Sequence, residues 1–384
     1  MMFRPPCTKE PTVCMSDYGH LWIPSPVEKI YLQIINDPTR NFEPLPVAGA
    51  TEFNRSATEF IIGKDSLAII ENRACSIQTL GSTGALWIGA DFLSRWYQSD
   101  HNKATVCIPS VAPGKHKWIF EDSGFTNICA YRFLDPKTKG LALPEMLEDL
   151  ENAPDFSIIV LQASCNPTGI HIPKSVWVQI ADIMKRKKMF PFFIMKAVGL
   201  NSGYVEKDAW SVRFFVSEGF ELFCAQSFSA NFGLYGERVG CLTVVIKTNE
   251  VLLGVCSQLE ILARSKWSAP PAVGARIVAT ILNNSFFYAE WKESIKEAAK
   301  RLMIIREKMK GKLRLLGTLQ SWEHITNQTG LFSYTGLTCV QVRLLIKKYH
   351  IYLHENGLIN ISSLNDSNLA YLLQSIHEVS SIPQ

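Results

Sequence analysis

Three short segments of the chain carry side chains that could bind a phosphate or another small anion. The first, Gly-Ser-Thr-Gly at residues 81–84, directly precedes a predicted helix, whose free N–H groups and positive dipole end attract anions. The second, Ser-Phe-Ser at residues 227–229, follows a predicted buried strand, and Arg238 lies nine residues beyond it. A planar guanidinium and two hydroxyl groups can together hold phosphate oxygens. Alone, the first segment is more typical of a capped turn, and the second of a polar turn with an arginine paired elsewhere.

The third segment, Asn-Pro-Thr-Gly at residues 166–169, follows the apolar run FSIIVLQ at 156–162. Alone it is a tight turn, because proline fixes φ and glycine permits a positive φ. The Asn166 side chain would lie at the end of a strand, where a ligand could use its amide. Ligands of open α/β sheets bind beyond the carboxyl ends of the strands. We therefore expect a site at the loops after residues 80, 109, 162, 194 and 227.

Short apolar runs alternate with helical patterns from residue 75 to about residue 246. This alternation predicts an α/β fold, an open and mostly parallel sheet with helices on both faces. The continuous apolar run at 156–162 is typical of a strand buried on both faces. Ser82 or Thr83 would cap the first helix, and another capped helix would start at Asp208. We expect strands at 105–109, 127–131, 156–162, 189–194, 221–227 and 240–246, and helices at 81–97, 144–152, 173–187 and 208–218.

After residue 249 the pattern becomes mainly helical, with a long helix predicted at 288–316. The last part of the chain, from residue 321, combines two helices with short strands at 331–334, 351–354 and 358–362. This mixture is typical of a smaller α+β unit. We therefore predict a large α/β domain at 46–315 and a small domain made of residues 19–45 and 316–384.

The composition excludes several classes of protein. The 384 residues are 47% apolar and 19% charged, which excludes a largely disordered chain and suits two domains. A net charge of +4 predicts no nucleic-acid and no membrane partner, and no apolar run reaches the roughly 18 residues of a spanning helix. The first 20 residues lack the apolar stretch of a signal peptide, so we expect a cytoplasmic protein. Ten cysteines without a CxxC pair indicate reduced thiols, and we predict no metal site.

Together the three segments are far more specific than any one of them alone. From about residue 19 to its end, the chain resembles the fold-type-I pyridoxal-phosphate aminotransferases, and within them the cytosolic aspartate aminotransferases. The first 18 residues do not match, and much of the N-terminal arm that crosses the dimer in this family is missing. The most distinctive stretches are LGSTGALWIGADFLSRWY, ENAPDFSIIVLQ, NPTG, SEGFELFCAQSFSANFGLYGERVG, PPAVGARIVA and HIYLHENGLINIS.

The resemblance assigns roles to several residues that this chain retains. The first two segments would bind the phosphate of pyridoxal 5'-phosphate, and Asn166 would contact the phenolic oxygen of this cofactor. Arg264 matches the arginine that binds the distal carboxylate of the substrate and reaches into the site of the other subunit. His116 matches a histidine beneath the cofactor ring. The implied cofactor-binding residues are Ser82, Thr83, Asn166, Ser227, Ser229 and Arg238.

The catalytic positions that the resemblance implies are, in contrast, degenerate. Ala230 stands where the family has the lysine that holds the cofactor as an aldimine, and Ile194 stands where an aspartate would face the pyridine nitrogen. Leu358 replaces the arginine that binds the α-carboxylate of the substrate. Alanine cannot move a proton, and such acid–base groups contribute about 10²–10⁴-fold to a rate. The other replaced positions are Ala197 for a tyrosine, Pro113 for a tryptophan and Pro44 for a tyrosine of the neighbouring subunit.

These losses predict an aspartate aminotransferase-like protein that is catalytically impaired or inactive. We expect a homodimer that binds pyridoxal 5'-phosphate non-covalently at most. The alternative is a non-enzymatic partner of an active paralogue, whose substrate site Arg264 would complete. A conventionally active enzyme would need another amine, such as Lys196, or Lys115 or Lys117 beside His116. A drifting duplicate without a selected role is the remaining hypothesis.

Overall fold

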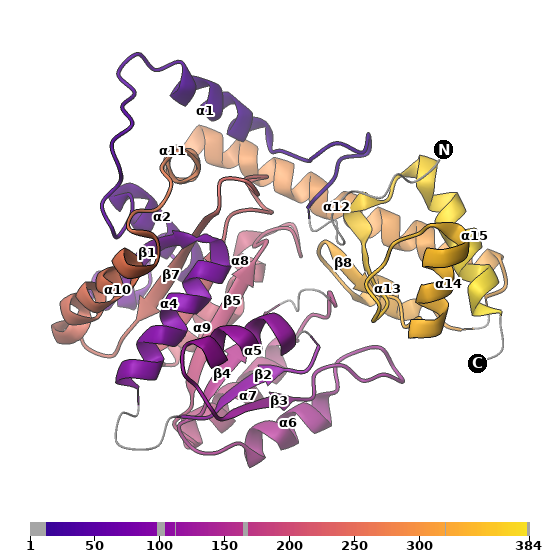
Figure 1. Ribbon diagram of the computed structural model, residues 1–384, viewed down its shortest axis with the longest axis horizontal. Helices are drawn as coiled ribbons and strands as arrows, with labels where there is room; N and C mark the ends of the chain where they lie inside the picture. Colours follow the sequence, from indigo (N-terminus) through magenta and orange to yellow (C-terminus); the bar gives the residue numbers. More distant parts are fainter. Residues whose placement is uncertain (1–12, 98–103, 112, 164–167, 319, 382–384) are drawn as a thin grey trace.

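The computed structural model describes residues 13–97, 104–111, 113–163, 168–318 and 320–381 (Figure 1). Its main sheet contains β1 (Ala74–Leu80), β2 (Val106–Pro109), β3 (Ile128–Tyr131), β4 (Ile158–Leu161), β5 (Phe190–Lys196), β6 (Leu222–Ser227) and β7 (Val239–Val245). Within the described residues the order of these seven strands is β1-β7-β6-β5-β4-β2-β3. β7 is antiparallel to both of its neighbours, and the other neighbouring pairs are parallel. The mostly parallel sheet expected from the sequence is confirmed.

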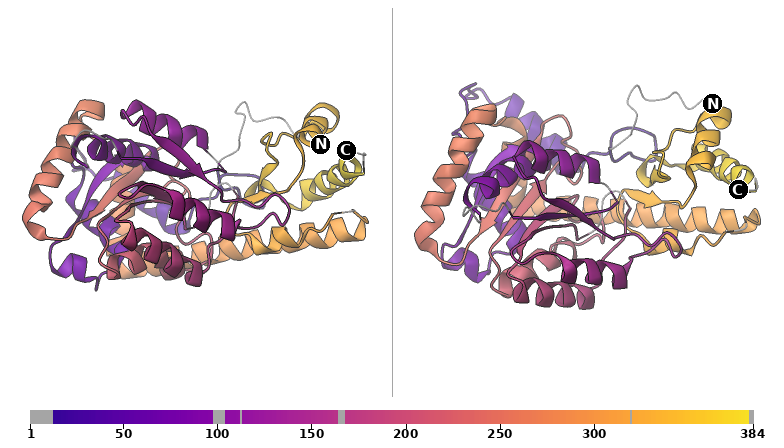
Figure 2. Two further views of the ribbon diagram at one scale, coloured as in Figure 1. Left: turned by 90° about the horizontal axis from the view of Figure 1, so that it is seen from below. Right: turned by 60° about the horizontal axis from the view of Figure 1, so that its bottom comes forward.

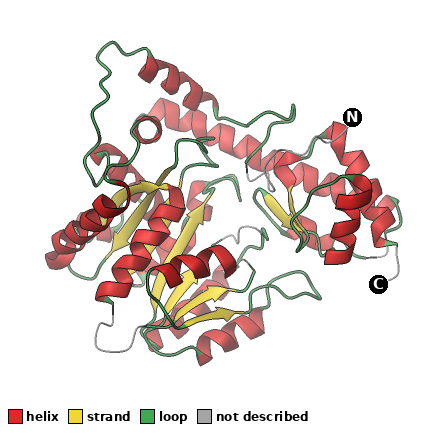
Figure 3. Cartoon of the chain, viewed as in Figure 1, coloured by secondary structure: helices red, strands yellow, loops and turns green. Residues whose placement is uncertain are grey.

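Helices cover both faces of this sheet (Figure 3). On β4, Ile158 and Val160 pack into the core beneath one helical layer, whereas Ile159 and Leu161 pack into the core beneath the other. The predicted strand with two buried faces is confirmed, because all four side chains of β4 are buried. Burying one such side chain contributes about 1.5–3 kcal/mol to stability. The first layer contains α4 (Gly81–Trp96), α5 (Pro113–Asp122) and α10 (Leu252–Trp267). The second contains α2 (Thr51–Ile62), α6 (Leu143–Asn152), α7 (Lys174–Arg186), α9 (Trp210–Ser217), α11 (Val273–Asn283) and α12 (Ser285–Leu315).

A smaller α+β unit lies at the other end of the molecule, and α12 runs from the main sheet to this unit (Figure 2). The unit contains the antiparallel pair of β8 (Phe332–Tyr334) and β9 (Leu358–Asn360), together with α13 (Glu323–Asn327), α14 (Cys339–Tyr349) and α15 (Asp366–Ser380). The described start of the chain joins it, because the Asn360 amide donates to Val13 O at 2.9 Å. α1 (Ser25–Ile35) packs instead on α11 and α12. The domain bounds given above stay a prediction.

Three expectations for the elements differ from the structure. From residue 321 the described chain has three helices, α13, α14 and α15, where two were expected. Residues 351–354, expected as a strand, form no strand, because His350 ends α14 in the left-handed region at φ +53° and turns the backbone. The helix predicted at 208–218 begins two residues later, as α9, and Ala209 separates it from a short preceding helix, α8 (Val205–Asp208). The Asp208 carboxylate caps neither helix and accepts from the N–H of Gly199 at 2.7 Å. This carboxylate therefore fixes the loop that follows β5.

No helix in the described part of the chain is both long enough and apolar enough to cross a lipid bilayer. The longest, α12, has 31 residues, and charged side chains recur along it. One apolar stripe runs along the whole of α12, from Trp291 and Ile295 near the start of the helix to Leu313 near its end, and it contacts both parts of the molecule.

The stability of the fold should depend on pH through the buried His324 of α13. Burial, and secondarily the charge of Lys139, lowers the pKa of His324 from its ordinary value of 6.5 to about 4. As the pH falls, the unfolded chain binds a proton at this position before the folded chain does. The stability that the neutral His324 contributes is therefore complete above about pH 6.5 and is lost as the pH falls from 6.5 to 4. Over this range the free energy of unfolding should fall by at most about 3 kcal/mol through His324.

Urea unfolding at pH 7.5, 6 and 5 measures this dependence. The variant His324→Gln should lose less unfolding free energy than the wild type between pH 7.5 and 5, whatever its stability at pH 7.5. His20→Gln, at an exposed histidine, is the matched control and should keep the dependence of the wild type. Equal pH dependence in the wild type and His324→Gln contradicts this role of His324.

Candidate cofactor-binding site

The carboxyl ends of β1, β5 and β6 meet at one edge of the main sheet. Lys196, at the end of β5, lies opposite Ser227, at the end of β6. Ser227 in turn lies opposite Gly240 at the start of β7, and Leu80 at the end of β1 lies opposite Val239. Three of the loops singled out in the sequence, after residues 80, 194 and 227, are therefore neighbours.

Two glycines allow the chain segments at this edge to touch. Gly81 has φ +67°, and its N–H donates to Arg238 O at 2.9 Å. A Cβ atom added to Gly240 would lie 2.4 Å from the carbonyl carbon of Gly81, a distance that no side chain tolerates. The close approach of these two backbones brings the start of α4 beside the segment that carries Arg238.

α4 begins at this edge with N–H groups that no side chain caps. Its N-cap is Leu80, so the expectation that Ser82 or Thr83 caps the helix is wrong. The reason is that the helix begins at Gly81, two residues earlier than a cap by Ser82 requires. Ser82 is buried and Thr83 is exposed within the first turn. The N–H groups of the first turn after Gly81 have no side-chain cap, and together with the positive dipole end of a 16-residue helix they suit an anion at this position.

The guanidinium of Arg238 lies directly against the first turn of α4. A Cβ atom added to Gly81 would be 2.7 Å from Nη2 of Arg238, so a side chain at position 81 would displace the guanidinium from this place. Nη1 of Arg238 donates to Tyr235 O at 3.1 Å, which orients the planar group. Because Arg238 is exposed and carries five N–H donors, donors remain for a ligand above α4.

The two serines of the 227–229 segment complete this group of donors. The N–H of Ser229 donates to Ser227 Oγ at 3.4 Å, which folds the segment back on itself. Oγ of Ser229 is buried and has no hydrogen-bond partner within the described residues. Leaving a buried hydroxyl unpaired costs about 1–3 kcal/mol, so a ligand oxygen at this point would relieve a penalty. We call Gly81, Ser82, Ser227, Ser229 and Arg238 the anion cup.

Three apolar side chains lie on the segments next to the anion cup. Ala230 is 9% exposed and lies in the turn that follows Ser229. Nδ2 of Asn231 donates to Val198 O at 3.1 Å, which ties this turn to the loop after β5. On β5 and its following loop, Ile194 and Ala197 are 4% and 5% exposed. None of these three side chains, Ala230, Ile194 or Ala197, offers an amine, a carboxylate or a hydroxyl.

The remaining positions singled out in the sequence come from elements outside the anion cup. His116 is buried on α5, which begins at Pro113, and Arg264 is exposed in the last turn of α10. Leu358 is buried at the start of β9, and Pro44 is exposed between α1 and α2. Asn166 lies outside the described residues. The structure thus gathers five positions of the phosphate segments at one edge of the sheet. Ala230 directly follows Ser229 in the chain, and Ile194 pairs with Ala225, two residues before Ser227.

A buried polar layer beneath the anion cup was not identified from the sequence. Nε2 of Gln226 donates to Thr243 Oγ1 at 2.8 Å and to Ala57 O at 3.0 Å. Ser76 Oγ lies 2.7 Å from the hydroxyl oxygens of both Thr243 and Thr58. These bonds join β1, β6 and β7 to α2, so they hold the strands that present the cup. The sequence did contain a signal for this layer, namely polar residues within otherwise apolar strands.

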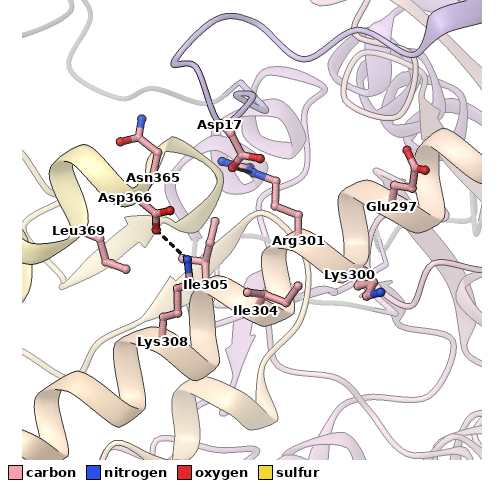
Figure 4. A pocket seen from close by; sticks show the side chains of 10 residues that line it. All are labelled: Asp17, Glu297, Lys300, Arg301, Ile304, Ile305, Lys308, Asn365, Asp366 and Leu369. Atoms are coloured by element: carbon pink, nitrogen blue, oxygen red, sulfur yellow. Dashed lines mark hydrogen bonds and ion pairs between the residues drawn. The ribbon is translucent and has the colours of Figure 1, made fainter.

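A separate pocket of about 290 Å³ lies between α12 and α15 (Figure 4). Four of its charged side chains form two ion pairs. Nζ of Lys308 is 2.7 Å from the Asp366 carboxylate, and Arg301 pairs with Asp17. Arg301 also donates to Met15 O at 2.9 Å, so this guanidinium fastens the start of the chain to α12. We assign the pocket a structural role.

The donor set fits one half of pyridoxal 5'-phosphate and not the other. The phosphate half meets a helix N-terminus, a guanidinium and an unpaired buried hydroxyl. For the ring half, Ala230 and Ile194 provide neither an amine for covalent attachment nor a charge for a ring nitrogen. The arrangement can hold a phosphorylated ligand, but its own side chains supply no group that moves a proton at position 230.

Comparisons with known proteins agree with this geometry. The family described as aminotransferase class I and II matches residues 14–376. The cytoplasmic aspartate aminotransferase of Gallus gallus is 48% identical over 365 residues, which cover 94% of this chain and 89% of that protein. The cytoplasmic aspartate aminotransferase of Saccharomyces cerevisiae has a TM-score of 0.91 at 34% identity, covering 96% of this chain and 90% of that one. A lysine-to-alanine mutant of a mitochondrial aspartate aminotransferase from Trypanosoma brucei has a TM-score of 0.90 at 37% identity, covering 96% and 94%.

Proposed function

Because this chain belongs to the class I and II aminotransferase family, we propose that it is an aspartate aminotransferase-like protein in which amino-group transfer is impaired or lost. Members of this family use pyridoxal 5'-phosphate as their cofactor. The observation that carries the proposal is the alanine at position 230, directly after an anion cup that retains its donors. The protein would hold the cofactor by its phosphate and without a covalent bond.

Three replaced side chains each remove a different requirement of the reaction. When bound, pyridoxal 5'-phosphate supplies an electron sink that stabilises a carbanion on an amino acid. Ala230 provides no amine to bind the cofactor or to move a proton, which alone should reduce a rate by about 10²–10⁴-fold. Ile194 cannot keep a ring nitrogen protonated, and Leu358 cannot pair with an α-carboxylate. Because the losses affect separate steps, no one of the remaining side chains compensates for all of them.

The fold does not depend on these lost groups. Ala230 and Ile194 belong to the apolar cores, Leu358 is buried on β9, and none of these three side chains needs a hydrogen-bond partner. The lysine-to-alanine mutant from Trypanosoma brucei and the unmutated protein both have a TM-score of 0.90 to this chain. We therefore expect the protein to fold normally even though its activity is reduced.

The decisive experiment combines spectroscopy with an activity assay on the purified full chain. Pyridoxal 5'-phosphate should bind, but borohydride treatment followed by dialysis should leave no cofactor on the protein. Transamination between aspartate and 2-oxoglutarate should be at least about 10²-fold slower than in an intact aspartate aminotransferase assayed in parallel. Cofactor trapped on a lysine, with Lys196 as the first position to inspect, would overturn the proposal. Full transamination activity would overturn it as well.

We infer from the same relatives that the protein works in the cytoplasm as a homodimer. The similar aspartate aminotransferases of Gallus gallus and Saccharomyces cerevisiae are both described as cytoplasmic. Proteins with this fold are typically homodimers. Measurement of the native mass tests the dimer directly.

A second candidate function rests on Arg264, which is exposed at the end of α10. In the family, the matching arginine completes the substrate site of the other subunit. In a heterodimer with an active paralogue, Arg264 of this chain would therefore complete the substrate site of the paralogue, while the site beside Ala230 would stay inactive. Co-expression with an active aspartate aminotransferase, followed by native mass measurement, tests this function, and homodimers alone would contradict it.

A further inference from the structure

The sulfur atoms of Cys75 and Cys256, two cysteines far apart in the sequence, lie close together. Sγ of Cys75, on β1, lies 2.7 Å from Sγ of Cys256, on α10. The two residues are 181 positions apart, so no spacing pattern in the sequence pairs them. Both are half-buried and their thiols are free. An oxidant in solution can therefore reach the pair.

The surroundings of the pair hold it in place. Cys75 pairs with Val244 of β7 in the sheet, and it packs against the core formed by β1, α4 and α10. α10 contacts both α4 and β1, so the helix that carries Cys256 rests on the strand that carries Cys75. A disulfide has an S–S distance of about 2.05 Å. The two sulfurs need to approach by well under an ångström, a displacement that side-chain rotation can supply.

A second close pair provides a useful contrast. Sγ of Cys107 lies 2.6 Å from Sγ of Cys129, and the two residues are directly opposite each other on β2 and β3. Cys107 is fully buried, and both sulfurs belong to the same sheet. A bond there would join strands that the sheet already pairs. A bond between Cys75 and Cys256 would instead join two layers of the fold.

We propose that Cys75 and Cys256 form a reversible disulfide, a redox-modification site that covalently ties β1 to α10. The oxidant is a small disulfide of the glutathione class. The thiolate of Cys256 attacks one sulfur of oxidised glutathione, breaks its S–S bond and releases one glutathione thiolate. The thiolate of Cys75 then attacks Sγ of Cys256 and releases the second. The protein loses two protons and two electrons, which leave as two molecules of reduced glutathione.

The local electrostatics support Cys256 as the attacking group. A hydrogen bond from the Cys75 thiol lowers the pKa of Cys256, against the opposing effects of burial and of Glu260. The same contact, together with burial, raises the pKa of Cys75. Since the thiolate is the nucleophile in disulfide exchange, the first attack falls to Cys256 and the second to Cys75.

The position of the bond connects it to the candidate site. β1 runs directly from Cys75 into Gly81 of the anion cup, and α10 runs from Cys256 to Arg264 two turns later. The disulfide would close a chain segment of about 180 residues, and cross-links over long segments restrict the unfolded state most. Oxidation should therefore stabilise the fold around the cup.

The test compares wild type, Cys256→Ser and Cys339→Ser after incubation with oxidised glutathione. Cys339 is exposed at the start of α14, which makes it the matched control for a cysteine outside the pair. Digestion without reduction, followed by mass spectrometry, should give a Cys75–Cys256 linked peptide from wild type and from Cys339→Ser. Oxidation should raise the midpoint of thermal unfolding of these two proteins by roughly 5–10 °C, and reduction should reverse the rise.

Two results would overturn the proposal. One is a wild-type digest in which Cys339 carries glutathione, so that the oxidant has acted, but no linked peptide of Cys75 and Cys256 is found. The other is a rise of the unfolding midpoint in Cys256→Ser that equals the rise in wild type. Because the peptides locate each bond, a cross-link between Cys107 and Cys129 cannot be mistaken for the proposed one.

Discussion

Replacing Ala230 by lysine should give the protein a covalent bond to pyridoxal 5'-phosphate that borohydride makes permanent. The new amine would follow Ser229 directly, beside the anion cup that we expect to hold the phosphate. Because a lysine both attaches the cofactor and moves protons, Ala230→Lys should also raise the rate of transamination by about 10²-fold or more over the wild type. Mass measurement after borohydride reduction, and an assay with aspartate and 2-oxoglutarate, check the two parts separately.

The matched control is Ala230→Met, which fills similar space in the turn without an amine. It should show neither covalent cofactor nor a faster reaction, so any gain in Ala230→Lys belongs to the nitrogen and not to the volume. The lysine variant should still remain well below an intact enzyme, because Ile194 and Leu358 are unchanged. Adding Ile194→Asp should raise the rate again. A lysine variant that binds the cofactor covalently but reacts no faster would show that the other lost groups dominate.

The sequence was sufficient to predict six of the seven strands of the main sheet, β2 to β7, because they are mostly apolar. β1 was not among the expected strands, since Ser76, Gln78 and Thr79 interrupt its apolar pattern. The side chains of the four β4 residues alternate between two buried cores. The continuous apolar run at 156–162 predicts such burial on both faces of a strand from the local sequence alone. The predicted strand at 351–354 was wrong for a physical reason. Ile351 and Leu353 have the alternation of a strand, but His350 in the left-handed region ends α14 and directs the chain into a turn that no local pattern specifies.

The candidate site was predictable in part. Serine, threonine, glycine and arginine at strand ends are visible in the sequence, and the structure brings the first two segments together. The sequence does not reveal why Gly81 and Gly240 must both lack a side chain, since their close contact joins residues far apart in the chain. The same limit applies to the sulfurs of Cys75 and Cys256 and to the polar layer around Gln226. The roles of the individual site residues stay predictions, and the anion cup is the part most directly open to test.

Replacing Arg238 by glutamine should weaken the binding of pyridoxal 5'-phosphate by about 10- to 100-fold. Hydrogen bonds to a charged group contribute about 1.5–3 kcal/mol, and each 1.4 kcal/mol changes a dissociation constant tenfold. The backbone bond from Gly81 N to Arg238 O does not involve the side chain, so the shape of the cup should persist in the variant. Calorimetric titration of the wild type and Arg238→Gln with the cofactor measures the difference.

Two controls separate the phosphate contact from other effects of the substitution. Arg95→Gln removes an exposed arginine in the last turn of α4, whereas Arg238 lies at the first turn, so the affinity for the cofactor should not change. Pyridoxal without its phosphate should bind the wild type and Arg238→Gln equally weakly, because the guanidinium would have no anion to hold. If Arg238→Gln instead bound the phosphorylated cofactor as tightly as the wild type, the anion cup would not be the phosphate site. If both ligands lost affinity to the same extent, Arg238 would act on the shape of the site and not on the charge of its ligand.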